Sequence, residues 1–205
     1  MFRINEVFRS IQGEGPAIGQ PATFIRFSGC NLSCVYCDTD HASCRPWRLE
    51  ELLDEAARGP SRVIITGGEP LLAGEALVPL AAGLAGTGRK IDIETNGTIS
   101  PPPDLPGFVD NFVVSPKLSN SENNPASRRL AAGLPPGFFK FVADDVADLD
   151  EAGLLAQEHP GRDIIVMPMA TDPKAVIEKM KILREPVEAR GWRLLPRLHV
   201  LLGLR

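Results

Sequence analysis

The sequence has few cysteines and histidines and no long apolar run. Its 205 residues include only four cysteines and three histidines. No apolar stretch approaches the length of a membrane-spanning helix, about 20 residues. The N-terminal stretch MFRINEVFRS also lacks the apolar segment of a signal peptide. We therefore expect a cytoplasmic protein with no membrane partner and with reduced thiols.

An excess of positive charge is also missing. Lysine and arginine together number 22 and aspartate and glutamate 26, which gives a formal net charge of −4. A protein that coats nucleic acid would carry a basic stripe, so we expect no nucleic-acid partner. The length predicts one domain, residues 1–205, with a core large enough to fold without disulfides.

Strand patterns alternate with helix patterns along the chain. We predict strands over residues 4–8, 22–28, 62–66, 90–94, 111–115, 139–143, 163–167 and 192–195, and helices over 47–58, 72–84, 146–158 and 173–190, the last capped by Thr171. Strands separated by helices predict an α/β fold with a parallel sheet. The pattern alone is compatible with an open doubly wound sheet and with a barrel.

Chemically distinctive residues follow directly after several predicted strands. In parallel α/β folds the carboxyl ends of the strands carry the ligand site, so we expect these residues to meet there. The segments are the cysteine cluster from Cys30, then 66–70 (TGGEP), 94–97 (ETNG), 115–117 (SPK) and the tail around His199.

Three of the four cysteines are tightly spaced. Cys30, Cys34 and Cys37 form the pattern C-x3-C-x2-C. A structural zinc site would need a fourth ligand, from Cys44 or His41, and zinc ligands usually come as two separated pairs. A [4Fe–4S] cluster held by three cysteines would leave one iron open to a substrate or cofactor. Clustered thiols in a reducing compartment indicate one of these metal sites.

The aromatic Tyr36 completes the pattern C-x3-C-x-aromatic-C, which resembles the radical S-adenosylmethionine (SAM) superfamily. The turn Gly67-Gly68-Glu69-Pro70 resembles that superfamily's GGE(P) motif, whose backbone meets SAM. The resemblance implies that the three clustered cysteines bind a [4Fe–4S] cluster and that Cys44 does not. It also implies that the open iron binds SAM, and that one electron cleaves SAM to a 5′-deoxyadenosyl radical.

Further motifs indicate one family within this superfamily. The segments 8–15, 19–21, 24–32, 38–39, 94–98 and 115–117 are very similar to the 7-carboxy-7-deazaguanine synthase family. Members are lyases of queuosine biosynthesis that convert 6-carboxy-5,6,7,8-tetrahydropterin to 7-carboxy-7-deazaguanine with loss of ammonia. The resemblance implies an incomplete TIM-type barrel of parallel strands, a Mg2+ ion, a homodimer and an electron donor such as flavodoxin.

The resemblance also assigns roles to individual residues. It implies SAM contacts from Tyr36, Asp38, Gly67, Gly68, Glu69, Glu94, Ser115 and Lys117. It implies substrate contacts from Gln12, Gly13, Glu14, Arg26, Thr66, His199 and Arg205, and a Mg2+ ligand in Thr39.

Strand alternation supports one of these roles independently. Arg26 lies between Ile25 and Phe27, so it points away from the face that these apolar residues share. If that face packs under helices, Arg26 points into the barrel, where a buried arginine needs an anion such as the substrate carboxylate. By the same alternation, Arg26, Glu94 and Lys140 would form a polar ring inside the barrel.

Two other functions remain open at this point. A radical SAM activating enzyme would act on a protein partner and would need no pterin pocket or Mg2+. A non-catalytic zinc or iron–sulfur scaffold would yield no 5′-deoxyadenosine when it is reduced in the presence of SAM.

Overall fold

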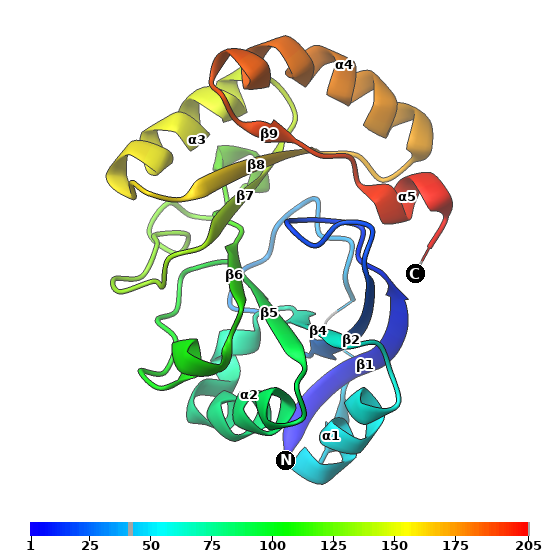
Figure 1. Ribbon diagram of the computed structural model, residues 1–205. Coiled ribbons are helices and arrows are strands. Elements are labelled where there is room, and N and C mark those ends of the chain that lie inside the picture. Colours follow the sequence, from blue (N-terminus) through cyan, green and yellow to red (C-terminus); the bar gives the residue numbers. More distant parts are fainter. Residues whose placement is uncertain (41–42, 205) are drawn as a thin grey trace.

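A single nine-stranded sheet curls into an open barrel (Figure 1). The computed structural model describes residues 1–40 and 43–204. The strand order is β3-β1-β2-β4-β5-β6-β7-β8-β9, and within the described residues the two edge strands, β3 and β9, do not pair. The predicted incomplete barrel is therefore confirmed. The strands are β1 (Phe2–Ile11), β2 (Pro21–Phe27), β3 (Arg45–Trp47), β4 (Arg62–Gly67), β5 (Lys90–Thr95), β6 (Asn111–Val114), β7 (Phe138–Ala143), β8 (Asp163–Pro168) and β9 (Arg193–Leu194).

The sheet is not parallel throughout, which corrects the prediction. The strands from β2 and β4 through β9 run parallel, whereas β1 is antiparallel to both β2 and β3. The physical reason is the short loop 12–20 between β1 and β2. A parallel pair needs a crossover of about a dozen residues or more, so this loop permits only an antiparallel pair.

Helices cover the outside of the barrel in two groups (Figure 1). Helices α1 (Leu49–Ala57) and α2 (Leu77–Gly86) lie below the sheet in this view, and α3 (Val146–Glu158) and α4 (Pro173–Ala189) lie above it. A short helix, α5 (Leu198–Leu202), ends the described chain. Three 3-10 segments complete the fold, namely η1 (Pro70–Ala76), η2 (Leu105–Phe108) and η3 (Ser119–Ser121).

The start of one helix and the N-cap of another differ from the prediction. The expected helix 72–84 begins only at Leu77, because Gly74 has a φ of +54° and interrupts the preceding 3-10 segment. Helix α4 is capped by Asp172 and not by Thr171. The Asp172 carboxylate accepts a hydrogen bond from the Ala175 amide, and a carboxylate is a strong cap for the free amides of a first turn.

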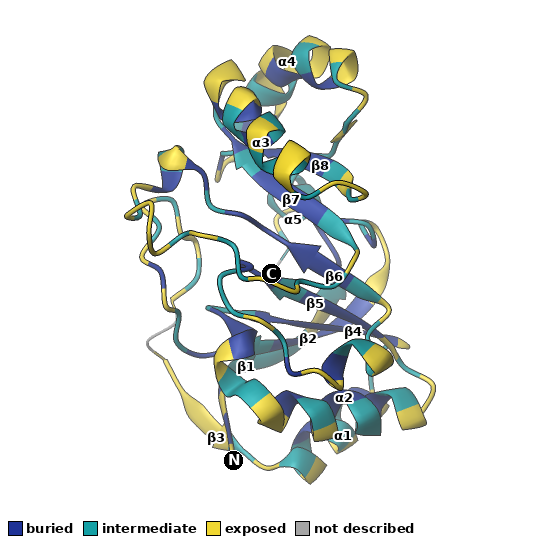
Figure 2. Cartoon of the chain, turned by 90° about the vertical axis from the view of Figure 1, so that its left-hand side faces the viewer, coloured by how far each residue is buried: buried dark blue, intermediate teal, exposed yellow. Residues whose placement is uncertain are grey.

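The outer face of β2, β4 and β5 forms the largest apolar core. Its strand residues include Ile25, Phe27 and Ile65, and they pack with Leu52 of α1 and Leu80 of α2. All five are buried, and Figure 2 shows the buried strands between more exposed helices. Full burial of each such side chain contributes about 1.5–3 kcal/mol, so this core determines which face of each strand points inward.

The inner face of the barrel is built in layers. The lower layer of the barrel interior lies at the amino ends of the parallel strands. There Arg62 pairs with Asp92 at 2.6 Å, and Asp92 also accepts a hydrogen bond from Asn111. A small apolar layer of Ala22, Phe24 and Ile64 lies next along the strands. The residues beyond it, at the carboxyl ends, are mainly polar, so the inward face changes from closed core to open site.

The seam between β1 and the C-terminal segment is closed by side chains and by one backbone contact. The Leu198 amide donates to the carbonyl of Gly13 at 2.9 Å. A Cβ on Gly13 would lie 2.3 Å from the ring of His199, so only glycine permits this approach. The C-terminus thus returns to the loop that follows β1.

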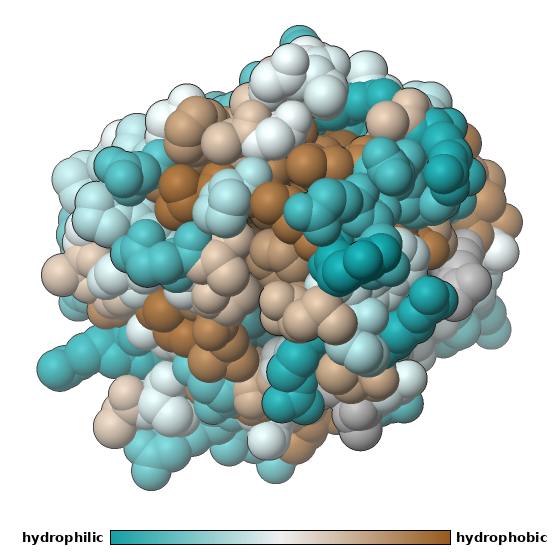
Figure 3. All heavy atoms as spheres, turned by 90° about the horizontal axis from the view of Figure 1, so that it is seen from below, coloured by the Kyte–Doolittle hydropathy of each residue, from teal (hydrophilic) through white to brown (hydrophobic). Residues whose placement is uncertain are grey.

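The outer surface mixes residue types. Seen from below, apolar side chains that reach the surface are interspersed with hydrophilic ones (Figure 3). None of the helices in the described part of the chain is long and apolar enough to cross a membrane.

Candidate active site

A cavity of about 520 Å3 opens at the carboxyl ends of the parallel strands. All predicted site residues line it except two. Glu69 is turned away from it, and Arg205 lies outside the described residues. Those that line it are Gln12, Gly13, Glu14, Arg26, Cys30, Cys34, Tyr36, Cys37, Asp38, Thr39, Thr66, Gly67, Gly68, Glu94, Ser115, Lys117 and His199.

The three clustered thiols face this cavity. Cys30, Cys34 and Cys37 line it, whereas Cys44 does not, and none of the four cysteines forms a disulfide. Cys34 Sγ accepts a hydrogen bond from the side chain of Asn123 at 3.1 Å. Burial, together with Glu69 and the two neighbouring thiols, raises the pKa of Cys30. His41, the other candidate zinc ligand, lies outside the described residues.

The spacing of the donors fits a cluster better than a single ion. Among the residues that the structure describes, no three histidine, cysteine, aspartate or glutamate side chains converge closely enough to bind one metal ion. A structural zinc ion needs four ligands around one point. An iron–sulfur cluster binds each thiolate through a different iron, so its ligands stand farther apart. Three thiols around one cavity meet that requirement.

The two glycines at the end of β4, Gly67 and Gly68, permit close backbone packing. Gly67 has a φ of +140°, and a Cβ on Gly68 would lie 1.9 Å from the carbonyl oxygen of Gly29. The Gly68 amide donates to Phe27 O at 3.1 Å. The GGE turn therefore rests directly on the start of the cysteine loop. Side chains at either glycine would push the two segments apart.

Glu69 braces the site and does not line it. Its side chain is 1% exposed and accepts hydrogen bonds from Leu71 N, Thr95 Oγ1 and Asn96 N at 2.7–2.9 Å. The predicted SAM contact therefore finds no support for this side chain, because protein donors already occupy both carboxylate oxygens. Burial raises the pKa of Glu69, although the hydrogen bonds it accepts and the nearby Lys117 oppose this shift.

Asn96 connects two motifs, and the sequence marked its segment, 94–97, without giving this side chain a role of its own. Its side chain donates to Asn31 Oδ1 at 3.0 Å and accepts from the Thr98 amide at 2.9 Å. Asn31 in turn donates to Thr98 Oγ1 at 2.7 Å. The loop after β5 is thereby fixed to the cysteine loop.

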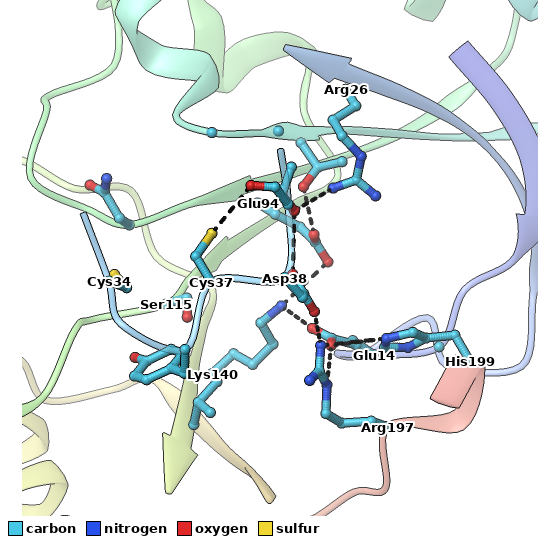
Figure 4. A pocket seen from close by; sticks show the side chains of 18 of the residues that line it. Glu14, Arg26, Cys34, Cys37, Asp38, Glu94, Ser115, Lys140, Arg197 and His199 are labelled. Atoms are coloured by element: carbon cyan, nitrogen blue, oxygen red, sulfur yellow. Dashed lines mark hydrogen bonds and ion pairs between the residues drawn. The ribbon is translucent and has the colours of Figure 1, made fainter. Parts of the chain in front are cut away.

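A polar network crosses the cavity between β4, β5 and β7 (Figure 4). Glu94 accepts hydrogen bonds from Thr66 Oγ1 at 2.9 Å and from Gln12 Nε2 at 3.1 Å. Lys140 Nζ lies 3.6 Å from Glu94 and 2.6 Å from Glu14. Glu94 therefore sits among residues predicted for the substrate, and the expected inward position of Lys140 is confirmed.

Glu14 is surrounded by nitrogen groups. Besides Lys140, it lies 3.2 Å from Arg197 Nε and 3.9 Å from His199 Nε2. Burial alone would raise the pKa of Glu14, but Lys140 and Arg197 together hold it far below its usual range. Burial lowers the pKa of His199, so its imidazole is neutral at physiological pH.

Arg26 points into the cavity, as alternation predicted. Its Nε lies 2.9 Å from Glu6 Oε1, and its Nη1 donates to Thr39 Oγ1 at 3.2 Å. The guanidinium also lies over the ring of Phe8. Thr39 Oγ1 is itself 3.3 Å from Asp38 Oδ1. Arg26 thus already donates to the carboxylate of Glu6 and to the hydroxyl of Thr39.

Lys117 is a cation with a neutral partner. Its Nζ donates to Ser115 Oγ at 2.9 Å, and no ion pair of Lys117 is found among the described residues. Burial lowers the pKa of this ammonium group. Because an unpaired cation in a cavity is costly, Lys117 is suited to bind an anionic group of a ligand.

Arg197 and Asn123 are further site residues that the sequence did not indicate. Arg197 lines the cavity and pairs with Glu14 and Asp38. Asn123 reaches Cys34 from a loop 89 positions away. No local pattern marks either residue, whereas Lys140 could be found because it interrupts an apolar strand.

Comparisons with known proteins agree with this geometry. Residues 24–114 match the Radical SAM superfamily model. The chain is 35% identical to the 7-carboxy-7-deazaguanine synthase of Pyrobaculum aerophilum, over 97% of this chain and 93% of that protein. It belongs to the 7-carboxy-7-deazaguanine synthase family. The family relative from Hyperthermus butylicus is 37% identical over 100% of this chain and 94% of its own.

A solved structure supports the family assignment. The crystal structure of QueE from Escherichia coli superposes with a TM-score of 0.78 at 27% identity, over 97% of this chain and 94% of that chain. The chain thus shares both fold and length with its 7-carboxy-7-deazaguanine synthase relatives.

Proposed function

We propose that this protein is a radical SAM lyase that converts 6-carboxy-5,6,7,8-tetrahydropterin to 7-carboxy-7-deazaguanine with loss of ammonia, as a step of queuosine biosynthesis. The observation that carries the proposal is one cavity lined on one side by three clustered thiols and on the other by a charged polar network. The identity to named synthases over nearly the whole chain supports the same reaction.

The thiol side would hold the cofactors. Cys30, Cys34 and Cys37 would bind a [4Fe–4S] cluster, and Lys117 would face the carboxylate of SAM beside the backbone of the Gly67-Gly68 turn. When bound, the cluster and SAM supply the one-electron chemistry that removes a hydrogen atom from the substrate. Ser115 would support this contact, because its hydroxyl already fixes the Lys117 ammonium group.

The polar side would hold the substrate. Arg26 would bind the substrate carboxylate through two parallel hydrogen bonds, exchanging its contact with Glu6. Gln12 and Glu14 would form hydrogen bonds with the donor and acceptor groups along the edge of the pterin. Glu14 is suited to accept hydrogen bonds, because its neighbours keep it ionised. The neutral imidazole of His199 would add one hydrogen-bond donor or acceptor at the rim of the cavity.

Thr39 would contribute one ligand to Mg2+. The ion prefers oxygen, and Thr39 Oγ1 lies near a carboxylate oxygen of Asp38. Arg26 also donates to this hydroxyl, so the oxygen becomes available to a cation when Arg26 turns to the substrate carboxylate. That carboxylate would complete the coordination sphere.

We also propose, from the family resemblance, one domain over residues 1–205, a homodimer, a cytoplasmic location and a flavodoxin-type electron donor. The donor would approach at the cysteine loop, where Val35 is 60% exposed next to Cys34. An activating enzyme for a protein partner is less well supported, because the charged network suits a small polar ligand.

The test is anaerobic reconstitution with iron, sulfide, SAM, dithionite and the tetrahydropterin, followed by mass analysis. We expect 7-carboxy-7-deazaguanine together with 5′-deoxyadenosine. Cys34→Ala should yield neither, whereas Cys44→Ala should yield both and serves as the matched control. Formation of 5′-deoxyadenosine without the deazapurine would indicate a different radical SAM substrate, and formation of neither by the unaltered protein would indicate a scaffold.

A further inference from the structure

The guanidinium group of Arg197 reaches across the seam between β1 and the C-terminal segment. Arg197 stands at the start of α5, and its side chain is only 12% exposed. Its Nε lies 3.2 Å from Glu14 Oε1, its Nη1 donates to Ala170 O at 2.9 Å, and its Nη2 contacts the Asp38 carboxylate. All three nitrogens are therefore used, each toward a different segment of the chain.

These three segments carry different parts of the site. Glu14 belongs to the loop after β1, Asp38 follows the cluster cysteine Cys37, and Ala170 follows β8. No backbone hydrogen bond joins the two edge strands of the sheet in the described residues. Figure 4 shows the Arg197 guanidinium between Glu14 and Asp38. Arg197 therefore connects the cluster loop, which carries Cys37 and Asp38, to the substrate loop after β1, which carries Glu14. It does so beside the Leu198–Gly13 backbone contact and the hydrogen bond from Arg26 to Thr39.

Arg197 also forms part of a wall between two cavities. A second cavity of about 560 Å3 lies outside the first at the seam. The residues that line both are Arg26, Asp38, Thr39, Thr171, Arg197 and His199. Separation of Arg197 from Asp38 would therefore join the inner cavity to the outer one.

We propose that Arg197 is a positioning residue. It sets the distance between the cluster loop, which carries Cys37 and Asp38, and the substrate loop, which carries Glu14, and it closes the barrel seam against water. The guanidinium is suited to this role because it is planar and presents five donors in fixed directions. A lysine would keep the charge but present one ammonium group, which reaches fewer of the three partners at once. The substrate side of this inference rests on the proposed function, and the loop-fixing side does not.

The first test measures amide hydrogen exchange in the full-length reconstituted protein. Arg197→Lys should speed exchange in residues 12–15 and 35–40 about tenfold, which is the effect of losing about 1.4 kcal/mol of charged hydrogen bonding. Exchange in α4 should not change. Arg193→Lys is the matched control, since Arg193 is exposed and forms no side-chain hydrogen bond or ion pair with the described residues. Unchanged exchange in Arg197→Lys would overturn the proposal.

The second test measures how closely the cleavage of SAM is coupled to formation of the deazapurine. With tetrahydropterin present, Arg197→Lys should raise the KM for this substrate about tenfold and raise the ratio of 5′-deoxyadenosine to deazapurine product. A purely structural role would lower both products together and leave their ratio unchanged, and that result would contradict the proposal. If Arg197→Lys does not fold, Asp38→Asn weakens the same contact from an exposed residue and should speed exchange in residues 35–40. Failure of the proposed function would remove the deazapurine from all variants but leave the exchange result intact.

Discussion

The barrel interior contains two polar layers with opposite roles. The lower layer is the Arg62–Asp92 pair with Gln20 and Asn111, in which Asp92 is 2% exposed. The upper layer lies at the carboxyl ends of the same strands and lines the cavity. Both layers contain paired charges, so charge alone does not distinguish a brace from a binding site.

The difference between the layers is free space. The charged groups of the lower layer are paired with each other, and none of its residues lines the cavity. In the upper layer the pairs surround about 520 Å3 of open volume, so a ligand can replace one partner of a pair. The lower layer should therefore govern stability, and the upper layer should govern binding and turnover.

The largest expected effect is on the stability of the lower layer. Arg62→Met leaves the buried Asp92 carboxylate without its cation and should lower the free energy of unfolding by about 3–5 kcal/mol. Chemical denaturation of the apoprotein measures this loss. The double variant Arg62→Met/Asp92→Leu should recover much of it. A single variant as stable as the parent would contradict a bracing role.

The next largest effect concerns substrate binding in the upper layer. Arg26→Lys keeps the charge but loses the two-pronged geometry, so the KM for the tetrahydropterin should rise about tenfold or more. Cleavage of SAM and the free energy of unfolding should change little, in contrast to Arg62→Met. Normal binding and turnover in Arg26→Lys would show that Arg26 does not anchor the substrate.

A smaller effect is expected on the turnover rate and on its response to Mg2+. Thr39→Val keeps the side-chain shape and removes the hydroxyl oxygen, so the turnover rate should fall severalfold and respond less to added Mg2+. The cluster spectrum should stay unchanged. A titration of rate against Mg2+ compares the two proteins, and identical curves would exclude Thr39 as a ligand.

The last effect is a pH dependence of stability. The pKa of Glu14 is lower in the folded protein than in the unfolded chain, so its carboxylate stabilises the fold above the unfolded pKa of about 4.5. This contribution is lost as the pH falls through the folded value. The stability gap between the parent and Glu14→Gln should therefore stay constant from neutral pH to about pH 5 and shrink below it. Urea denaturation at several pH values measures the gap, and a gap that widens toward acidic pH would mean that burial outweighs the neighbouring cations.

Local sequence patterns predicted much of the fold and part of the site. Alternation in 24–28 placed Ile25 under the helices and Arg26 in the cavity, since a strand points successive side chains to opposite faces. The parallel strands and their end motifs predicted that the cysteines and the GGE turn would meet. The same local reasoning missed the antiparallel β1 and did not foresee that the Glu69 side chain braces the loop around Asn96, while the SAM contact of this motif stays a prediction.

By itself the sequence determined the spacing of the thiols, the glycines that allow two loops to touch and the inward charges on the strands. These features depend on backbone geometry within a few residues, which a sequence displays directly. Only the tertiary structure decided which charges face one another. Arg197 meets Glu14 across 183 positions because the sheet curls until its two ends adjoin. Whether a buried charge supports the fold or binds a ligand depends on the volume left around it, and that volume exists only in the folded chain.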